Sequence, residues 1–494
     1  MLSRPRRWGW PGGRQIWAAL ALGLAAACGQ APLGAWYVSL PALAGLIWLI
    51  ARVPATSAVW LAWFGGAGYF AAALSWIVQP FLIDAARDGW MAPFALPLIS
   101  FGLALFWALA GYLSRFFRSR GAGFALGLTA AELMRGYVLT GFPWALPGHI
   151  WIDTPVAQLA ALIGPNGLTL LTLGTASALA MRRVVPALAG LAVLVAAWGF
   201  GLWALSQPDP APRGVTLRLV QPNAAQQAKW DPDLANLFFD RLLAYSAVKP
   251  APDLVIWPET ALPYLLDRHP ELASMIAQAA GGAPVALGRQ REQGDLFWNS
   301  LSVITPQGEI SANYDKHHLV PFGEYIPFGD LLFNWLNISA FASSMGNGYT
   351  AGPGPQLLDL GGKLGRALPL ICYEAVFPQD LRGTERADWL LQITNDAWFG
   401  TLTGPFQHAA QARLRAIEQG LPLVRVGNTG VTAVYDARGR ISADLPFGTA
   451  SYLDAALPGA LPAPPYARFG EMPLLVLLAG LALALVPGWK RRLP

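Results

Sequence analysis

Cysteine, histidine and charged side chains are all scarce in this chain of 494 residues. It contains two cysteines and five histidines, and only 13% of its residues are charged, about half the share of an average soluble domain. The two cysteines, Cys28 and Cys372, lie too far apart in sequence to indicate a disulfide framework or a zinc site. The chain also lacks CxxC, HExxH, GxSxG, phosphate-loop and calcium-loop motifs, which argues against the enzyme classes that depend on them.

The apolar residues, 54% of the chain, gather instead in long runs. A membrane-spanning helix needs roughly 17–25 mostly apolar residues, and eight runs of that kind can be placed. They lie near 12–31, 33–51, 55–79, 92–113, 121–139, 156–181, 185–205 and 472–488. The sequence therefore predicts a polytopic helical membrane bundle of about eight spans.

Basic residues cluster between these runs and predict how the spans are oriented. The clusters are Arg4, Arg6, Arg7 and Arg14; Arg52; Arg115, Arg118 and Arg120; Arg182 and Arg183; and Lys490, Arg491 and Arg492. With eight spans, all of them fall on one side, which the positive-inside rule assigns to the cytoplasm. We therefore expect a multi-pass protein of the bacterial inner membrane with both termini cytoplasmic. The net charge of +5 then reflects topology and not nucleic-acid binding.

Between the seventh and eighth spans, the sequence predicts a globular domain in the periplasm. Proline-rich joints at 207–212 and 458–465 read as linkers, so the expected domains are 1–206, 207–466 and 467–494. Within the middle one, short β-branched runs alternate with helical stretches, which favours a layered α/β fold. The expected strands are Val215–Gln221, Asp253–Pro258, Pro284–Arg289, Leu301–Thr305, Leu368–Cys372, Trp389–Thr394, Leu423–Val426 and Thr432–Tyr435, with helices near 231–247, 270–280 and 405–419. The stretch 338–354 has no clear period and is either a mobile apolar lid or a surface loop.

Three residues in this domain suggest covalent acyl chemistry. Cys372 ends one strand-like run, Glu259 follows another in Trp257-Pro258-Glu259, and Lys316 follows a third segment. A thiol beside a base is the pattern of a nucleophile, and a fixed ammonium can stabilise an oxyanion. The adjacent His317 and His318 suggest a metal, but side chains at i and i+1 are expected to diverge, so we predict no metal and no cofactor.

The order and spacing of these segments resemble the Glu-Lys-Cys triad of the nitrilase superfamily. The matching segments are Trp257-Pro258-Glu259, then Tyr314-x-Lys316-x-His318-Leu319-Val320-Pro321-Phe322-Gly323-Glu324, then Ile371-Cys372-Tyr373-Glu374. With the eight-span context, the chain resembles the apolipoprotein N-acyltransferases, a membrane-embedded branch of that superfamily. The resemblance implies an α-β-β-α sandwich domain.

The resemblance also implies roles for single residues. Glu259 would be the general base, Lys316 the oxyanion-stabilising lysine and Cys372 the nucleophile, while Glu324 would orient the lysine. The other positions that match family motifs are Trp230, Tyr373, Glu374, Asn395 and Trp398, of which Trp230, Asn395 and Trp398 would contact substrate. For Trp230 and Trp398, anchoring at the lipid headgroup level is the alternative.

The implied reaction moves an acyl chain from a phospholipid to the N-terminal amine of a diacylated apolipoprotein through a Cys372 thioester, the last step of bacterial lipoprotein maturation. The main alternative is a membrane-tethered amidase of the nitrilase type, in which water resolves the thioester. A transporter is a further alternative, because Glu132 and Arg135 lie within a predicted span.

Overall fold

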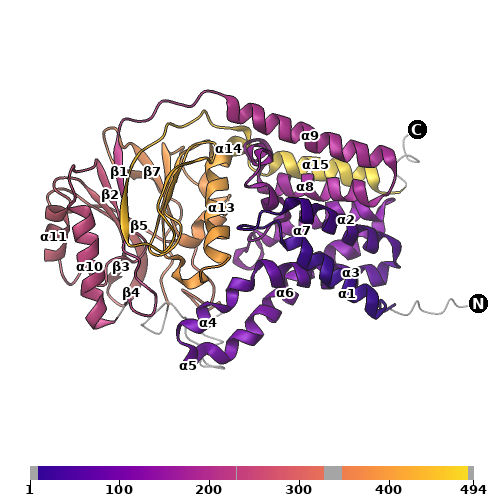
Figure 1. Cartoon of the computed structure of the whole chain (residues 1–494), viewed down its shortest axis with the longest axis horizontal. Helices are drawn as coiled ribbons and strands as arrows, with labels where there is room; N and C mark the ends of the chain where they lie inside the picture. Colours follow the sequence, from indigo (N-terminus) through magenta and orange to yellow (C-terminus); the bar gives the residue numbers. More distant parts are fainter. Residues whose placement is uncertain (1–8, 230, 328–347, 488–494) are drawn as a thin grey trace, which may run out of the picture. The chain divides into compact units, whose positions relative to one another are not determined.

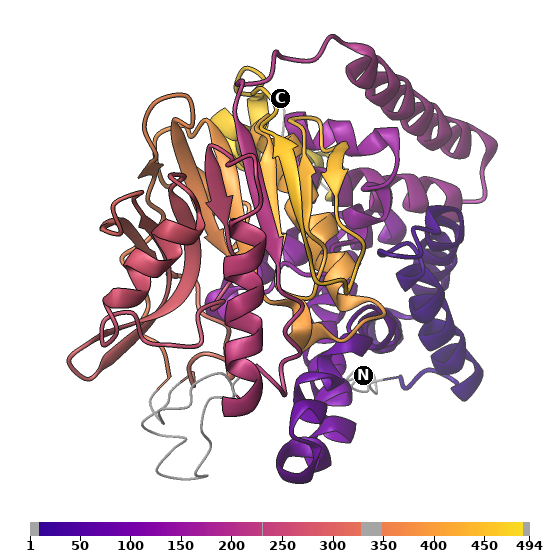
Figure 2. The same cartoon turned by 60° about the vertical axis from the view of Figure 1, so that its left-hand side comes forward.

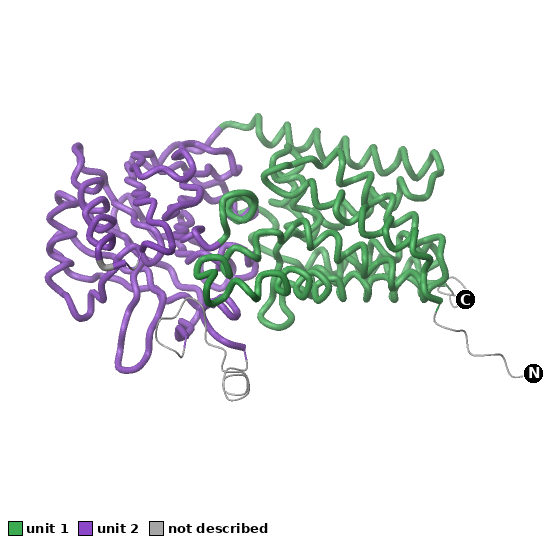
Figure 3. Tube along the Cα trace, turned by 60° about the horizontal axis from the view of Figure 1, so that its bottom comes forward, with its two compact units in different colours: residues 1–208, 399–410, 463–494 green, residues 209–398, 411–462 purple. Residues whose placement is uncertain are grey.

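The computed structural model describes residues 9–229, 231–327 and 348–487 of the chain. Two predictions therefore fall outside the described residues: the role of Trp230, and most of the stretch 338–354. The chain divides into two compact units (Figure 3). Unit 1 comprises Met1–Pro208, Phe399–Ala410 and Ala463–Pro494, and unit 2 comprises Asp209–Trp398 and Gln411–Pro462. The grouping of Phe399–Ala410 with unit 1 has no counterpart in the predicted domain limits.

Unit 1 is helical, and a long helix coincides with each of the eight predicted apolar runs. These helices are α1 (Gly13–Ala27), α2 (Trp36–Arg52), α3 (Ala55–Ala73), α6 (Ala92–Leu113), α7 (Arg120–Arg135), α8 (Ala160–Ala180), α9 (Val184–Ser206) and α15 (Met472–Leu485). The shorter α4 (Pro80–Ile83), α5 (Ala85–Asp88) and α14 (Pro465–Phe469) lie between them along the chain.

Not all of these helices are long enough to cross a bilayer. Three helical stretches, Ala85–Phe116, Pro155–Ala180 and Val184–Ser206, meet the length and hydropathy expected of a span. A fourth is added if the bent pair Ala55–Ala73 and Ser75–Ile83 counts as one span, while α2 and α15 are apolar but shorter. Since a helix rises about 1.5 Å per residue, α15 with its 14 residues is shorter than a hydrocarbon core of about 30 Å. The described residues thus support three or four spans, fewer than the eight predicted.

Glycines allow α1 and α3 to pack with their backbones in contact. A Cβ atom on Gly23 would lie 2.0 Å from the carbonyl oxygen of Gly65, and one on Gly68 would lie 2.3 Å from that of Leu20. Small residues at such crossings are the usual means of close helix approach in membranes.

The two ionisable residues of α7 are paired with each other. Arg135 forms an ion pair with Glu132 inside the bundle, and Trp107 donates its indole N–H to Oε1 of Glu132 at 2.8 Å. Both charges therefore have partners within the protein, as buried charges require. This pairing gives the two residues a structural role and removes the main reason to consider a transporter.

Unit 2 contains two six-stranded mixed sheets. The strand order is β12-β1-β2-β3-β4-β5 in one sheet and β11-β10-β9-β8-β7-β6 in the other. The strands β1 to β3 are parallel, as are β7 to β9, and the remaining pairings are antiparallel. The strands are β1 (Thr216–Gln221), β2 (Leu254–Ile256), β3 (Val285–Gln293), β4 (Leu296–Ile304), β5 (Ile310–Asp315), β6 (Leu358–Asp359), β7 (Arg366–Ile371), β8 (Trp389–Thr394), β9 (Leu423–Gly427), β10 (Ala433–Tyr435), β11 (Ile441–Asp444) and β12 (Ser451–Ala456).

The two sheets lie face to face with helices on their outer faces (Figures 1 and 2). On one sheet, α10 (Pro232–Ser246) and α11 (Glu271–Ala279) bury Leu242 and Ile276 against Val255 and Val285. On the other, α13 (Gly404–Gln419) buries Ala412 and Ala416 against Leu390 and Leu423. Alternate residues such as Leu254, Ile256 and Ile393 are also fully buried, because successive side chains of a strand point to opposite faces. The predicted α-β-β-α sandwich is confirmed.

Close helix packing in unit 1 generates a prediction. Gly23→Leu should lower the Tm of the detergent-solubilised protein by several degrees, because the new side chain collides with the backbone of Gly65. The matched control is Gly102→Leu in α6, where a Cβ meets nothing within 4 Å. Thermal unfolding of both variants checks this, and an equal Tm for the two would contradict the packing described.

Candidate active site

The candidate site lies where several strands of unit 2 end. Glu259 comes three residues after β2, Lys316 directly follows β5, and Cys372 directly follows β7. In open α/β sheets, groups at the carboxyl ends of parallel strands meet at one edge. Cys372 has a φ of 50°, a left-handed conformation that is uncommon for a residue with a side chain. The backbone thus turns sharply at the thiol.

Glu259 is held by donors from three other segments. Asn299 donates its amide to Oε1 of Glu259 at 2.7 Å, and Lys316 Nζ lies 3.5 Å from the same oxygen. The backbone N–H of Asn395 donates to Oε2 at 2.8 Å. Gly288 allows this close packing, since a Cβ there would lie 2.6 Å from the Cα of Glu259. The carboxylate is 6% exposed, so its orientation depends on these contacts.

Lys316 is buried between two carboxylates. Its Nζ lies 2.8 Å from Oε2 of Glu324 as well as 3.5 Å from Oε1 of Glu259, and its side chain is 1% exposed. Burial alone would lower the pKa of Lys316, but the charges of Glu324 and then Glu259 outweigh burial and raise it. The side chain is therefore a fixed ammonium ion at neutral pH.

The thiol of Cys372 is close enough to Glu259 and Lys316 for both to affect its ionisation. Burial and then the charge of Glu259 raise the pKa of Cys372, while Lys316 and a hydrogen bond with Thr394 partly oppose them. The resting group is therefore a thiol, and it needs a base to become a thiolate. The structure thus brings together Glu259, Lys316 and Cys372, together with Glu324.

Glu374 connects the loop that carries Lys316 with the turn that carries Cys372. Its Oε2 accepts the backbone N–H of Ile371 at 2.7 Å. Its Oε1 accepts the hydroxyl of Tyr314 at 2.9 Å and the backbone N–H of His317 at 2.8 Å. Because Glu374 is fully buried, its removal would leave several donors without partners.

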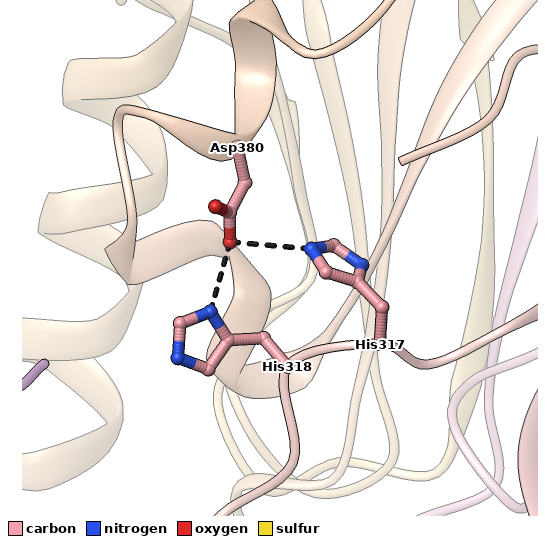
Figure 4. Close-up of side chains that lie close together, drawn as sticks. All are labelled: His317, His318 and Asp380. Carbon is pink, nitrogen blue, oxygen red and sulfur yellow. Dashed lines mark hydrogen bonds and ion pairs between the residues drawn. The ribbon is translucent and has the colours of Figure 1, made fainter. Parts of the chain in front are cut away.

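His317 and His318 both point at Asp380 (Figure 4). The His318 Nδ1 lies 3.0 Å from Oδ2 of Asp380, and the His317 Nε2 lies 3.4 Å from it. The prediction that these neighbouring side chains diverge is wrong, because the chain between them turns and Asp380 attracts both rings. Two imidazoles and a carboxylate are a possible metal-ligand set, but His317 is also an ion-pair partner of Glu374, 2.7 Å from its Oε1.

Hydrogen bonds to two carboxylates favour the charged form of His317. Burial would lower the pKa of His317, but its hydrogen bonds to Asp380 and Glu374 outweigh burial and raise it to about 9. For Asp380, burial would raise the pKa, but the contacts with His317 and His318 outweigh burial and lower it. An imidazolium therefore lies between two carboxylates and offsets the charge of buried Glu374.

The remaining predicted residues lie near the site in different ways. Tyr373 is buried with its ring edge-on to His318 and Phe377. Asn395 contacts Glu259 through its backbone, and its side chain bonds Gln226 and Asn428. Trp398 is half-buried after β8. For Asn395 and Trp398, the substrate contact remains a prediction.

Several polar residues that contact Glu259, Glu324 and Cys372 were missed by sequence reasoning. Asn299 joins both carboxylates, donating to Oε1 of Glu324 at 3.0 Å besides its bond to Glu259. Gln392 donates to the carbonyl of Cys372 at 3.1 Å and is itself held by Arg425, which pairs with Asp396. Asn299, Gln392 and Arg425 are polar residues within largely apolar strands. That contrast is the sequence signal that could have identified them.

Lys229 is a further missed residue. Its Nζ lies 3.4 Å from the carbonyl oxygen of Glu259. Burial lowers the pKa of Lys229 to about 8, against the opposing charge of Glu259. Its only sequence signal was its position beside Trp230.

Comparison with known proteins extends over both units. Residues 216–461 match the family model for carbon-nitrogen hydrolases, and residues 22–178 match that for the N-terminal domain of apolipoprotein N-acyltransferases. The apolipoprotein N-acyltransferase of Caulobacter vibrioides is 40% identical, with 96% of this chain and 94% of that protein aligned. That of Allorhizobium ampelinum is 36% identical over 88% of each. A solved CN-hydrolase superfamily protein from Xanthomonas campestris is 22% identical over 49% of this chain and 90% of its own, with a TM-score of 0.38.

The ionisation of Cys372 can be tested by alkylation. Glu259→Gln should shift the pH profile for iodoacetamide labelling of Cys372 to lower pH, because it removes a negative charge that raises the thiol pKa. Labelling at pH 8 should become several-fold faster, as measured by mass spectrometry of the Cys372 peptide. Labelling of Cys28 in the same sample is the internal control, and an unchanged Cys372 profile would refute the coupling.

The His317 network predicts a pH-dependent stability. The pKa of His317 is raised on folding, so its contribution is complete below about 6.5 and is lost as pH rises through about 9. His317→Gln should therefore lower Tm by a few degrees at pH 6 and by little above pH 9.5. The control is His269→Gln at an exposed position, where only a small change is expected. A constant Tm difference across this range would show that His317 is not an imidazolium.

Proposed function

We propose that this chain, which belongs to the apolipoprotein N-acyltransferase family, transfers an acyl chain from a phospholipid to the N-terminal amine of a diacylglyceryl-cysteine lipoprotein through a thioester on Cys372. The observation that carries this proposal is the convergence of Glu259, Lys316 and Cys372 in one buried site, in a chain that aligns with 94% of a curated relative's length.

In the first half of the reaction, Cys372 attacks an ester carbonyl of the phospholipid. Glu259 accepts the thiol proton as the sulfur–carbon bond forms, and it returns that proton to the leaving oxygen, so that a lysophospholipid departs. The raised pKa of Cys372 favours this order of events, because proton transfer then accompanies attack instead of preceding it.

The tetrahedral intermediate carries a negative oxygen that needs a fixed positive partner. Lys316 fits this role because Glu324 and Asn299 keep its surroundings rigid, so that little reorganisation is needed as charge develops. A backbone N–H near Tyr373 is the proposed second donor. Electrostatic contributions of this kind are worth roughly 3–4 kcal/mol per donor.

In the second half, the α-amine of the lipoprotein's N-terminal cysteine attacks the thioester. Glu259 takes a proton from the amine and delivers it to the departing sulfur, which restores the Cys372 thiol and leaves an amide. Because the two substrates react in turn with one covalent intermediate, the kinetics should be ping-pong. The chemistry requires no cofactor.

Both substrates are lipids, which accounts for a membrane bundle attached to the catalytic domain. We place the protein in the bacterial inner membrane with eight spans, unit 2 in the periplasm and both termini in the cytoplasm, as the arginine clusters indicate. Shorter helices such as α15 would then cross with local thinning of the bilayer. Trp230, Asn395 and Trp398 are proposed to contact the bound lipids.

Transfer to an amine is favoured over hydrolysis by the N-terminal match. Residues 22–178 correspond to the N-terminal domain of acyltransferases, whereas hydrolysis of a small amide needs no lipid-facing bundle. An amidase of the nitrilase type is therefore the less favoured function.

Mass spectrometry of the purified protein tests this function. After incubation with phosphatidylethanolamine alone, an acyl-sized adduct should appear on Cys372, and a diacylated lipopeptide should then remove it and emerge N-acylated. Cys372→Ala should reduce both products below detection, while Cys28→Ala, which alters the other cysteine, should retain both. Absence of the adduct in the native protein would overturn the thioester, and release of free fatty acid without N-acylated peptide would favour the amidase.

A further inference from the structure

An apolar groove runs through unit 1 among α7, α8, α9 and α15. Its volume is about 630 Å³, within the roughly 300–1,000 Å³ typical of ligand sites. Along α8 it extends from Leu162 to Met181, and the part from Gly167 to Met181 alone is about 21 Å long at 1.5 Å per residue. One bilayer leaflet contributes about 15 Å of hydrocarbon, so the groove is long enough for one acyl chain.

Glycine residues, which have no side chain, leave the space that forms this groove. Gly174 in α8 lines it, and a Cβ there would meet nothing within 4 Å. On the facing α9, Gly190 approaches Ala178 of α8 so closely that an added Cβ would lie 3.0 Å from the Ala178 methyl. The helices therefore pack closely at Gly190 and leave open space at Gly174.

The groove also contains a polar group without a partner. Ser177 lines it, is 4% exposed, and its hydroxyl makes no hydrogen bond with any described residue. A buried hydroxyl normally has a partner, so this one is available to a ligand atom such as an ester oxygen.

One end of the groove is basic. Met181 and Leu485 line that end, Arg182 and Arg183 directly follow Met181, and the backbone N–H of Arg118 bonds the carbonyl of Leu485 at 3.0 Å. These three arginines are exposed. None of them forms an ion pair with any carboxylate in the part of the chain that the structure describes.

Two guanidinium groups near this end share a single indole ring. Arg52 lies 4.5 Å and Arg182 5.3 Å from the ring centroid of Trp48. Trp48 also has its indole N–H unpaired among the described residues. Ile47, next to Trp48, and Ser177 both contact the space above Gly121, which places this cation pair at the groove's Ser177 end.

The acidic residues of unit 1 cannot balance these charges. Asp84 and Asp88 pair with Arg87, Glu132 pairs with Arg135, and Glu471 accepts from Asn166 and Tyr466. The fifth, Asp153, lies beside Gly34, which precedes α2, whereas Arg52 ends that helix. The exposed arginines at this end are therefore open to an anion from outside the protein, and a phosphate diester suits guanidinium geometry.

We propose that this groove binds one anionic glycerophospholipid, with an acyl chain along α8 and the phosphate at Arg182, Arg183 and Arg52. Basic pockets between membrane helices are a recognised form of lipid site. By the positive-inside rule this lipid belongs to the cytoplasmic leaflet. The site is separate from the acyl chemistry of Cys372 and does not rest on it.

The test uses the full-length Cys372→Ala protein, so that no acyl chain can be transferred to the thiol. It is reconstituted with phosphatidylglycerol that carries a photoreactive diazirine on one acyl chain, and cross-linked peptides are mapped by mass spectrometry. Label should concentrate on α8, α9 and α15, and an equivalent phosphatidylcholine probe should give at least fivefold less.

Two kinds of variant locate the site. Gly174→Phe should fill the groove and reduce the label at least fivefold, while Gly102→Phe, at another helix position with open space, should not change it. Arg182→Gln with Arg183→Gln, at exposed positions, should reduce phosphatidylglycerol labelling to the phosphatidylcholine level. These exposed substitutions keep the test valid if Gly174→Phe fails to fold.

Other results would overturn the proposal. Equal labelling by both lipids, or labelling unaffected by Gly174→Phe, would mean ordinary solvation by the bilayer. Loss of label with millimolar inorganic phosphate would mean that the arginines bind a free anion without the groove. Cross-links between two copies of the chain at α8 and α15 would mean that a second protomer covers this face.

Discussion

The candidate site depends on one buried cation, the ammonium of Lys316. Removing a charge from water is costly unless close partners replace the solvent, and here Glu259 and Glu324 do so, with Asn299 bridging them. The two carboxylates come from different segments, and each helps to fix the position of the other because both contact Lys316. Glu259 and Lys316 are therefore one electrostatic unit, and neither can be changed without altering the other.

Cys372, the proposed nucleophile, is held by a second set of contacts. Cys372 adopts a left-handed backbone conformation, which costs energy and persists only where neighbouring contacts enforce it. Glu374 supplies such contacts by bonding both the Cys372 turn and the loop after Lys316, and Gln392 holds the Cys372 carbonyl. Because Glu374 carries a buried charge, the protonated His317 beside it stabilises the whole arrangement.

Much of unit 2 could be predicted from its sequence because its central strands are continuous apolar runs. The strands that carry Glu259 and Cys372 were expected at the right places, as were α10, α11 and α13. The four edge strands β5, β6, β11 and β12 were missed. The residues of β5, β11 and β12 are mostly exposed or partly exposed and lack an apolar pattern, and β6 has only two residues. In unit 1, hydropathy located the helices, but their ends depend on packing, so helices such as α15 proved shorter than the predicted runs.

The sequence by itself determined which chemistry to propose: motif order pointed to the thiol, the carboxylate and the amine, and apolar runs indicated a membrane bundle. These features are local, because residue type and spacing along the chain carry them. Only the tertiary structure revealed that Asn299 joins the two carboxylates, that His317 and His318 converge on Asp380, and that the glycines of α8 leave a groove whose Met181 end lies beside arginines. Each of these depends on residues distant in sequence that meet through strand register or helix packing, which no single segment encodes.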